Sequence, residues 1–249
     1  MRSPIASVVA AALALAPVVA AAQQPPADTV AQVNRQHVTS PAQYEAARKK
    51  HMAWHKSQGD KWAWNVYEIT TGPDTGAYLI STIGHTWADI EAWQGKLGTA
   101  DTDNAQQTMG GTIAKTETAY WSTVNAISRL PQGSTTPAPF LHVTLFELKG
   151  GQDFAMMAAI GKIKAALEAA KFPTSAIWYR QVSGGPVSNY AVVVPLPNLS
   201  ALGGPAVAAT LVSQLGQQNA TALLNELFAT VASTRTELLQ HRPDLSYVP

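Results

Sequence analysis

Hydrophobic and polar residues follow one pattern twice along this chain. In the first half, a β-branched and aromatic run at residues 62–71 leads through a turn containing Gly and Pro into a second such run at 77–83. In the second half, the runs at 176–182 and 189–194 have the same order and nearly the same lengths. Runs of this composition around a short turn predict a β-hairpin, so we expect one hairpin in each half.

Residues of the same type recur in both halves at a constant separation. Three pairs are each 112 positions apart: Tyr67 and Tyr179, Gly72 and Gly184, and Tyr78 and Tyr190. A fixed separation is typical of an internal repeat, which has to be recognised before the fold is predicted. We therefore expect two structural units of the same architecture.

Predicted strands and helices flank both hairpins in the same order. The strand and helix that precede the hairpins are at 29–38 and after Ser40-Pro41, then at 140–148 and 152–170. A short helix, a longer helix and a final strand follow at 87–97, 104–119 and 120–130, then at 199–207, 219–234 and 235–247. The order β-α-β-β-α-β is the split-βαβ, ferredoxin-like pattern of an α+β protein.

One such unit leaves a sheet face rich in Trp, Tyr and Val uncovered, and two units can bury these faces against each other. In this element order the chain resembles the dimeric α+β barrel superfamily, which includes the antibiotic-biosynthesis monooxygenase, NIPSNAP and EthD-like families. The resemblance implies tandem ferredoxin-like repeats that form a pseudo-dimeric barrel within one chain. The expected divisions are a signal peptide at 1–22, a first unit at 28–130, a linker at 131–139 and a second unit at 140–249.

The first residues match a bacterial secretory signal peptide. Arg2 precedes an apolar run over residues 5–22, which ends in three small residues. Small residues at this point suit signal peptidase, so we expect cleavage after Ala22 and a mature chain that begins at Gln23. The protein is then expected to be periplasmic or secreted, without a membrane span after cleavage.

The composition narrows the possible functions. The chain contains no cysteine, which excludes disulfides, cysteine nucleophiles and thiolate metal sites. Its 17 basic and 16 acidic residues nearly balance, so we expect no positive surface for nucleic acid. Fusion of two units also removes the usual need for a homodimer, which predicts a monomer or a weak oligomer.

Two histidines form a candidate metal site. His51 and His55 are four residues apart on the predicted first helix, so both imidazoles can project from one face and bind a metal ion. A third ligand is required, and His37, His85 or His142 would supply it only through the fold. The alternative is a solvated basic helix face that these histidines share with Arg48, Lys49, Lys50 and Lys56.

Aromatic residues indicate a ligand pocket in the first half. Six of the seven tryptophans lie there, which makes this half the expected site for a small apolar ligand. The predicted pocket residues are Trp54, Trp64, Tyr67, Tyr78, Trp87 and Trp121. Core packing is the alternative for each ring, because aromatic side chains dominate protein cores as well.

From the residues alone we predict an exported small-molecule-binding or accessory protein, without an assigned catalytic residue or cofactor. The resemblance implies pockets for small organic molecules, quinones or haem. It therefore gives an alternative function as a cofactor-independent oxygenase or a haem-dependent enzyme. The haem-ligand candidates are His37, His85, His142 and His241. A second alternative is an envelope protein-interaction module that uses exposed aromatic residues of the first unit.

Overall fold

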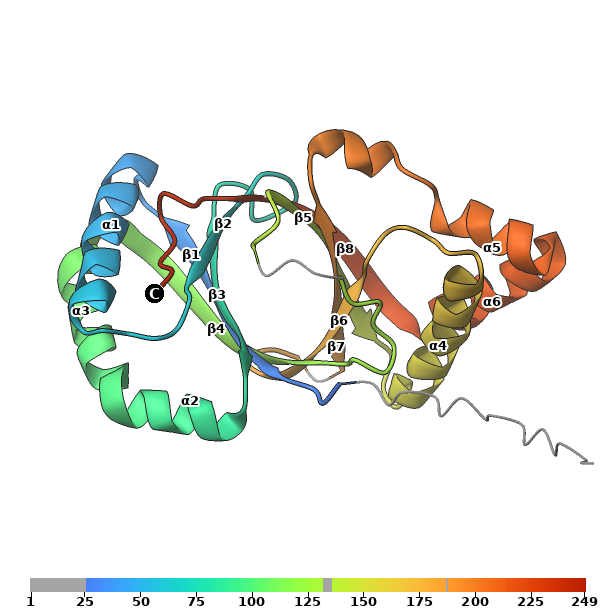
Figure 1. The fold of residues 1–249 in the computed structure, drawn as a ribbon, viewed down its shortest axis with the longest axis horizontal. Coiled ribbons are helices and arrows are strands. Elements are labelled where there is room, and N and C mark those ends of the chain that lie inside the picture. The colour runs from blue at the N-terminus through green and yellow to red at the C-terminus, as the bar shows by residue number, and fades with distance from the viewer. Residues whose placement is uncertain (1–25, 132–135, 187) are drawn as a thin grey trace, which may run out of the picture.

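Eight strands form one closed barrel, and helices cover it on two opposite sides (Figure 1). This computed structural model describes residues 26–131, 136–186 and 188–249. The predicted signal peptide and residues 132–135 of the predicted linker lie outside the described residues. Neighbouring strands are all antiparallel, in the order β1-β3-β2-β8-β5-β7-β6-β4. The predicted α+β class with one closed barrel is therefore confirmed.

The first half of the molecule, from β1 to β4, contributes four strands and three α-helices. In chain order these are β1 (Val30–Val38), α1 (Pro41–Ser57), β2 (Asn65–Ile69), β3 (Tyr78–His85), α2 (Trp87–Trp93), α3 (Thr99–Met109) and β4 (Ile113–Thr123). A π-helical turn at Gln94–Gly98 joins α2 to α3, and a 3-10 turn at Gly110–Thr112 joins α3 to β4.

The second half, from β5 to β8, has a similar order of elements. They are β5 (Phe140–Leu148), α4 (Asp153–Ala169), β6 (Ile177–Ser183), β7 (Asn189–Leu196), a 3-10 turn (Leu199–Gly203), α5 (Val207–Leu215), α6 (Gln217–Ala229) and β8 (Val231–His241). The strands are ordered β4-β1-β3-β2 in the first half and β8-β5-β7-β6 in the second. The first and fourth strands are therefore neighbours in both halves.

The last strand of each half begins earlier than the sequence predicts. The expected helix at 104–119 ends at Met109, and β4 begins at Ile113; the expected helix at 219–234 is α6, and β8 begins at Val231. From their third residue, both strands continue with polar, exposed residues, so their first halves show no hydrophobic alternation. Antiparallel pairing of β4 with β1 and of β8 with β5 fixes them as strands, because tertiary context overrides local preference.

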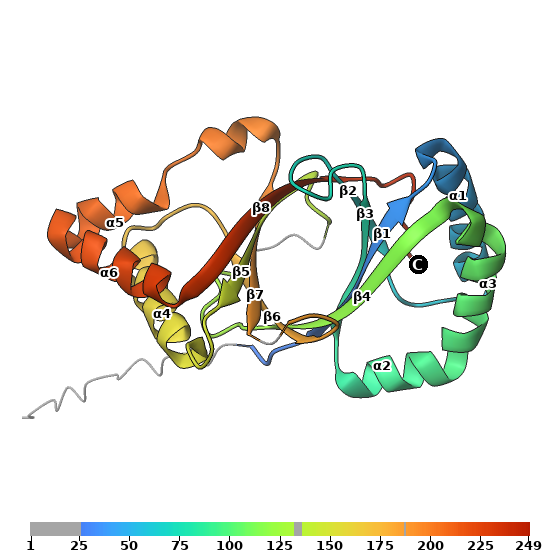
Figure 2. The same ribbon diagram turned by 180° about the vertical axis from the view of Figure 1, so that it is seen from behind.

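Alternating side chains give each sheet two different faces. On β1, Ala31, Val33 and Arg35 face the barrel interior, whereas Gln32 and Gln36 face the helices. An apolar cluster inside the barrel joins residues of both halves: Tyr67, Ile69, Ala77, Val143, Ala191 and Leu239. Figure 2 shows the barrel between the two helical layers from behind. The barrel interior is thus the apolar surface that holds the two sheets together.

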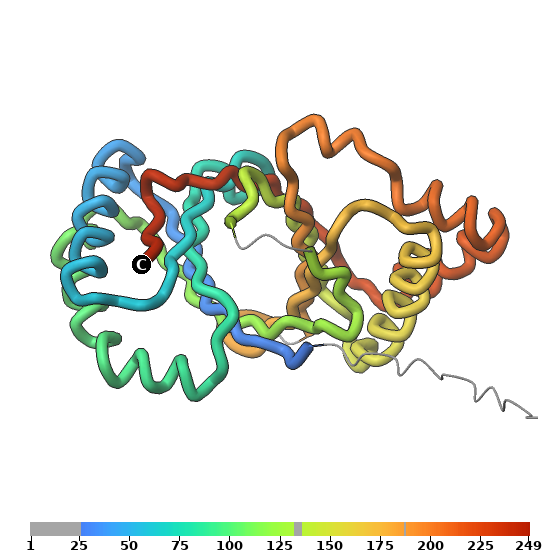
Figure 3. The backbone as a smooth tube through the Cα atoms, in the orientation of Figure 1, coloured from blue at the N-terminus to red at the C-terminus, as the bar shows by residue number. Residues whose placement is uncertain are grey.

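Each half also ends in the core of the other half. After β4, Val124 and Ile127 pack into the apolar core of the second half, and Arg129 pairs with Ala176. After β8, residues 242–247 cross to the first half, where Leu245 is fully buried. Figure 3 shows the chain ending beside the helices of the first half. No helix within the described residues is long and apolar enough to cross a membrane.

Candidate functional site

A polar cavity of about 420 Å³ lies between the first sheet and the helices α1 and α3. Polar side chains reach it from several elements, among them β1, α1 and α3. Gln32, Asn34 and Gln36 come from β1, Arg48, His51 and His55 from α1, and Asp101, Thr102 and Gln106 from α3. Polar groups in this number between a sheet and its helices are unusual, because this layer normally forms the apolar core.

The second half fills the corresponding layer with apolar side chains. Its helix α4 has the same length as α1 and the same place in the order of elements. When the two helices are aligned by their ends, Arg48, His51 and His55 correspond to Ile160, Ile163 and Leu167, all buried in an apolar core. The fold is therefore satisfied by hydrophobic residues at these positions, and the ionisable residues of α1 need another explanation.

Three potential metal ligands converge at this cavity. The Nε2 atoms of His51 and His55 are 3.3 Å apart. Asp101 Oδ1 lies 3.2 Å from Nε2 of His51 and 3.1 Å from Nε2 of His55. Within the described part of the chain, these residues form the one group of three whose ligand atoms lie within 4.8 Å of one another. The third potential ligand beside His51 and His55 is thus Asp101 of α3, and not one of the histidines named as candidates.

Hydrogen bonds on the far side of both imidazoles orient the rings. Nδ1 of His51 lies 2.8 Å from Oδ1 of Asn104, and Nδ1 of His55 lies 2.8 Å from Oδ2 of Asp60. Both partners can accept through oxygen, so the neutral tautomer that donates from Nδ1 leaves the lone pair of Nε2 available to bind an ion. Oxygen partners of this kind are typical of metal-binding histidines.

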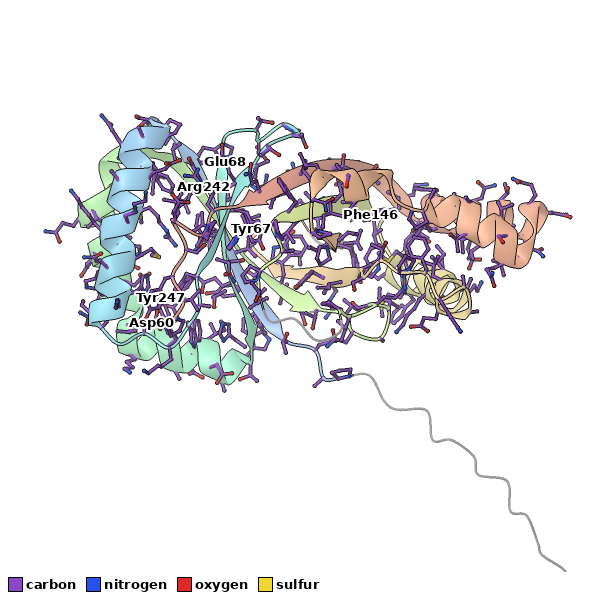
Figure 4. All side chains as sticks on the ribbon, turned by 45° about the horizontal axis from the view of Figure 1, so that its top comes forward. Asp60, Tyr67, Glu68, Phe146, Arg242 and Tyr247 are labelled. Carbon is purple, nitrogen blue, oxygen red and sulfur yellow. The ribbon has the colours of Figure 1, made fainter. Side chains whose placement is uncertain are left out.

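Asp60 is itself held firmly. Its carboxylate accepts hydrogen bonds from the indole nitrogens of Trp64 and Trp93 at 3.0 and 3.2 Å, and from the backbone of Trp62. The hydroxyl of Tyr247, from the crossing C-terminal segment, donates to the Asp60 carbonyl at 2.7 Å. Figure 4 shows Asp60 and Tyr247 close together in the first half. The orientation of His55 therefore depends on Asp60 and on the residues of α2 and of the C-terminal segment that hold Asp60 in place.

The arrangement of His51, His55 and Asp101 is more favourable with a cation between the three side chains than without one. With both Nδ1 atoms protonated, two lone pairs and a carboxylate oxygen face each other, and Asp101 Oδ1 has no hydrogen-bond partner among the described residues. Burial raises the pKa of Asp101, but hydrogen bonds and positive charge from the two histidines outweigh it and lower this pKa to about 2. When both rings are neutral and protonated on Nδ1, a bound cation would supply that positive charge instead. Three acceptors 3.1 to 3.3 Å apart repel one another unless a positive charge lies between them.

The distances also suit metal coordination. An ion at about 2.0–2.1 Å from each ligand atom would see them at angles of roughly 100°. This value lies between the right angle of an octahedral site and the tetrahedral angle. Two histidines and one carboxylate on one side of an ion leave its other positions open toward the cavity.

Burial excludes the solvated-face alternative for the α1 histidines. The side chains of His51 and His55 are 3% and 2% exposed, and Arg48 is buried as well. Only the lysines Lys49, Lys50 and Lys56 of the predicted basic face are exposed. That alternative is therefore wrong for the residues that line the cavity.

The predicted aromatic residues occupy different places in the fold. Trp64 lines the polar cavity, and Trp54 stacks on His51 with ring centroids 5.8 Å apart. Tyr67 and Trp121 line a second cavity inside the barrel. Tyr78 is buried and donates to Glu45 at 2.7 Å, outside both cavities. Trp87 is 49% exposed and lies against Tyr120.

The second cavity has about 1200 Å³ and lies within the barrel. Its walls are mostly apolar and come from both halves: Val33, Leu79, Trp121, Leu141, Val143, Leu145, Val193 and Leu239 are among them. Tyr67 and Tyr179 add two hydroxyl groups, and burial raises the pKa of Tyr179 to about 12. Both hydroxyls therefore remain protonated at neutral pH.

The residues around the two cavities do not provide a haem site. In the polar cavity, both imidazoles direct Nε2 to one point shared with Asp101, which fits a single ion and not one axial ligand over a flat ring. No histidine is among the described residues that line the barrel cavity. Burial of Tyr179 disfavours the phenolate that would bind iron there. His85 stacks on Trp62, with ring centroids 3.8 Å apart.

Solved structures share this architecture at low sequence identity. A candidate monooxygenase from Fusobacterium nucleatum aligns with a TM-score of 0.56 and 11% identity over 87% of this chain and 93% of that protein. An anthrone oxidase-like protein aligns with a TM-score of 0.52 and 15% identity over 86% of this chain and 91% of that protein. A mutant chlorite dismutase from Candidatus Nitrospira defluvii aligns with a TM-score of 0.52 and 11% identity over 87% of this chain and 92% of that protein. These are dimeric α+β barrel proteins, and the likeness shows a shared fold.

No family model and no curated protein sequence matches this chain. The geometry of the two cavities therefore carries the functional argument, with the structural neighbours as support for the fold.

Proposed function

We propose that this protein binds one divalent transition-metal ion through His51, His55 and Asp101 and uses it in an oxygenase reaction. The observation that supports this most directly is the set of three ligand atoms 3.1 to 3.3 Å apart at the wall of a cavity. A site with two histidines and one carboxylate is typical of non-haem iron oxygenases, and zinc enzymes use a similar set.

Two further features support a catalytic site over a structural one. A structural ion is normally enclosed by four protein ligands, whereas three ligands beside a cavity leave positions for substrate or oxygen. The structural neighbours include a candidate monooxygenase and an anthrone oxidase-like protein, which favours oxygen chemistry over hydrolysis at the level of the fold. When bound, the ion would activate oxygen or a bound substrate, and the residues of this chain would hold both in the cavity.

The first test measures metal binding by the purified protein and its Asp101→Ala variant. After incubation with Fe²⁺, Co²⁺ or Zn²⁺ and dialysis, mass spectrometry of the metal content should give one ion per chain. We expect Asp101→Ala to weaken binding more than 100-fold, because even partners that only orient the ligands contribute about 10- to 100-fold. Asp103→Ala is the matched control, since Asp103 is exposed on the same helix and should leave affinity unchanged.

Nitric oxide then tests whether the iron site is open to a diatomic ligand. Fe²⁺-loaded protein exposed to nitric oxide should give the paramagnetic resonance signal of an iron nitrosyl. A wild-type protein that retains no divalent ion at concentrations near its own would contradict the metal site. An ion that binds but never takes up nitric oxide would leave a metal protein without the oxygenase function.

We also infer a second function, the binding of a small apolar molecule inside the barrel. The supporting observation is the cavity of about 1200 Å³ with mostly aliphatic walls. Val143 lies in this wall and is buried, so Val143→Trp should fill the space and block entry. Trp121 and Tyr67 in the same wall would contact the ligand.

Native mass spectrometry of the protein as isolated, and titration with an environment-sensitive naphthalene dye, test this binding. We expect the dye to bind the wild type and to bind Val143→Trp at least 10-fold more weakly. Exposed Val248→Trp is the control for the added ring. Equal binding by all three proteins would contradict a ligand site in the barrel.

We further propose that the barrel consists of two fused ferredoxin-like units and that the protein is exported after cleavage behind Ala22. The equal strand orders of the halves and the constant separation of Tyr67 and Tyr179 support the first inference. The apolar run at 5–22 supports the second. Export is checked by the mass of protein recovered outside the cytoplasm, which should correspond to a chain that begins at Gln23.

A further inference from the structure

We propose that the substrate of this site is a small organic carboxylate, bound by the guanidinium group of Arg48 beside the metal ligands. This inference rests on the proposed function, because it assigns a substrate class to the same cavity. It depends on an unpaired buried charge, on the shape of the free donors and on the charge of the site.

Arg48 lies on the same face of α1 as the two histidines. Positions 48, 51 and 55 are three and seven residues apart, a spacing that places their side chains along one stripe of a helix. All three line the polar cavity, and Arg48 is only 4% exposed. A group bound to Arg48 would therefore lie in the same cavity as the metal ligands.

Two nitrogen atoms of the Arg48 guanidinium group lack the hydrogen-bond partners that buried donors normally have. Nε and Nη2 of Arg48 are buried and make no hydrogen bond within the described structure. A buried charge without hydrogen bonds costs several kcal/mol, so proteins rarely retain one without a function. Asp101 attracts Arg48 electrostatically, but no hydrogen bond joins the two side chains. The unfilled donors indicate a ligand.

The positions of the two free donors select a carboxylate. Nε and Nη2 lie on one edge of the planar guanidinium group, where two parallel N–H bonds can meet the two oxygens of one carboxylate. Gln32 Oε1, also buried in the wall of this cavity, lacks a donor as well. A hydroxyl or amino group on the same substrate would satisfy it.

The charge of the site favours one added anion. With a divalent ion bound, Arg48 adds one positive charge, while Asp60 and Asp101 each add one negative charge. The sum is one positive charge, which a monocarboxylate neutralises. Lys115 at the cavity pairs with Glu117 at 2.7 Å and does not change this balance. A volume of about 420 Å³ limits the ligand to a small molecule.

Glycolate, mandelate and benzoate are suitable probes, since the first two carry a hydroxyl group beside the carboxylate and benzoate does not. Calorimetric titration of the metal-loaded and the metal-free protein measures their affinity. We expect Arg48→Met to weaken carboxylate binding about 10- to 100-fold, the loss of a charged, two-bond contact. Arg48→Lys should give an intermediate loss, because it keeps the charge but not the planar fork. Lys50→Met, on the exposed face of α1, is the matched control.

Metal affinity and stability separate this role from a structural one. Removing an unpaired positive charge should leave metal binding at least as tight and the melting temperature equal or higher, whereas loss of a structural residue would lower both. Carboxylate affinity within about threefold of the wild type in Arg48→Met would overturn the proposal, as would binding of inorganic phosphate but none of the carboxylates. Absence of metal binding would instead contradict the proposed function, and the metal-free titration would still decide the role of Arg48.

Discussion

Two glycines at equivalent places hold the two halves in close contact. Gly72 follows β2 and Gly184 follows β6, and both have positive φ, at 97° and 89°. A Cβ at Gly72 would lie 3.0 Å from the carbonyl oxygen of Thr236 on β8. A Cβ at Gly184 would lie 2.7 Å from Cα of Ala119 on β4. The repeat of glycine along the chain therefore has a physical reason, because each lets the backbone of the opposite half approach.

Gly184→Ala should lower the free energy of unfolding by about 2–4 kcal/mol, since it combines a left-handed backbone with a clash against β4. Gly76→Ala is the matched control, with a φ of 88° and no atom within 4 Å of the added Cβ. It should cost about 1 kcal/mol through the backbone alone. Urea denaturation measures both, and equal losses would show that the contact between the halves contributes nothing.

At the proposed metal site, the sequence indicates two of the three candidate ligands. The spacing of His51 and His55 predicts that they act together, but it does not reveal Asp101. The helix α3 begins at Thr99 directly from a π-helical turn, and its N-cap, Gly98, has helical backbone angles and no side-chain hydrogen bond. Without a capping residue there is no start signal, and the predicted helix at 104–119 leaves Asp101 outside it. Asp101 and Asn104 are three residues apart and so lie on one face of a helix. This spacing of two polar residues is the sequence signal that could have indicated the third candidate ligand.

Among the elements, the segment after β8 connects the two halves in addition to the strand pairs of the barrel. Trp64 and Tyr247 exchange backbone hydrogen bonds at 2.8 and 3.0 Å, which adds a short bridge beside β2. Leu245 is fully buried in the core of the first half, next to the residues that orient His55. The segment is therefore part of the layer that contains His51, His55 and Asp101, although it follows the last strand of the second half.

Leu245→Ala should lower the free energy of unfolding by about 2–5 kcal/mol, the usual cost of a cavity left by leucine. Val248→Ala, at a side chain that is 69% exposed, should change it by less than about 0.5 kcal/mol. Tryptophan fluorescence during urea denaturation is a suitable measure, because six of the seven tryptophans precede residue 131. If Leu245→Ala left that transition unchanged, the first half would be stable without the crossing segment.

Hairpins and first helices are the elements that the sequence predicts best. The strand at 140–148 has the predicted bounds, and α1 begins at Pro41 after Ser40 as expected. Apolar alternation and a proline at the first helical turn are local signals that do not depend on the rest of the fold. The starts of β4 and β8 depend on pairing with β1 and β5, which no local pattern contains.

For the molecule as a whole, the uncovered sheet faces predict the barrel, and the structure closes it through β2 with β8 and β4 with β6. The two cavities could not be predicted in the same way. Their volumes depend on how polar and apolar faces meet across elements, as in the difference between α1 and α4.

The closed barrel also determines how this protein can meet other proteins. An open sheet exposes unpaired N–H and C=O groups along its outer strands, and these groups promote aggregation and strand exchange. Here every strand of the barrel has a neighbour on both sides. The pairs that close it are short, because β8 meets β2 only at residues 239–241 and β4 meets β6 only at residues 120–123. Strand-templated contacts with a partner are therefore confined to the earlier residues of β4 and β8, and other contacts would form through helices and loops.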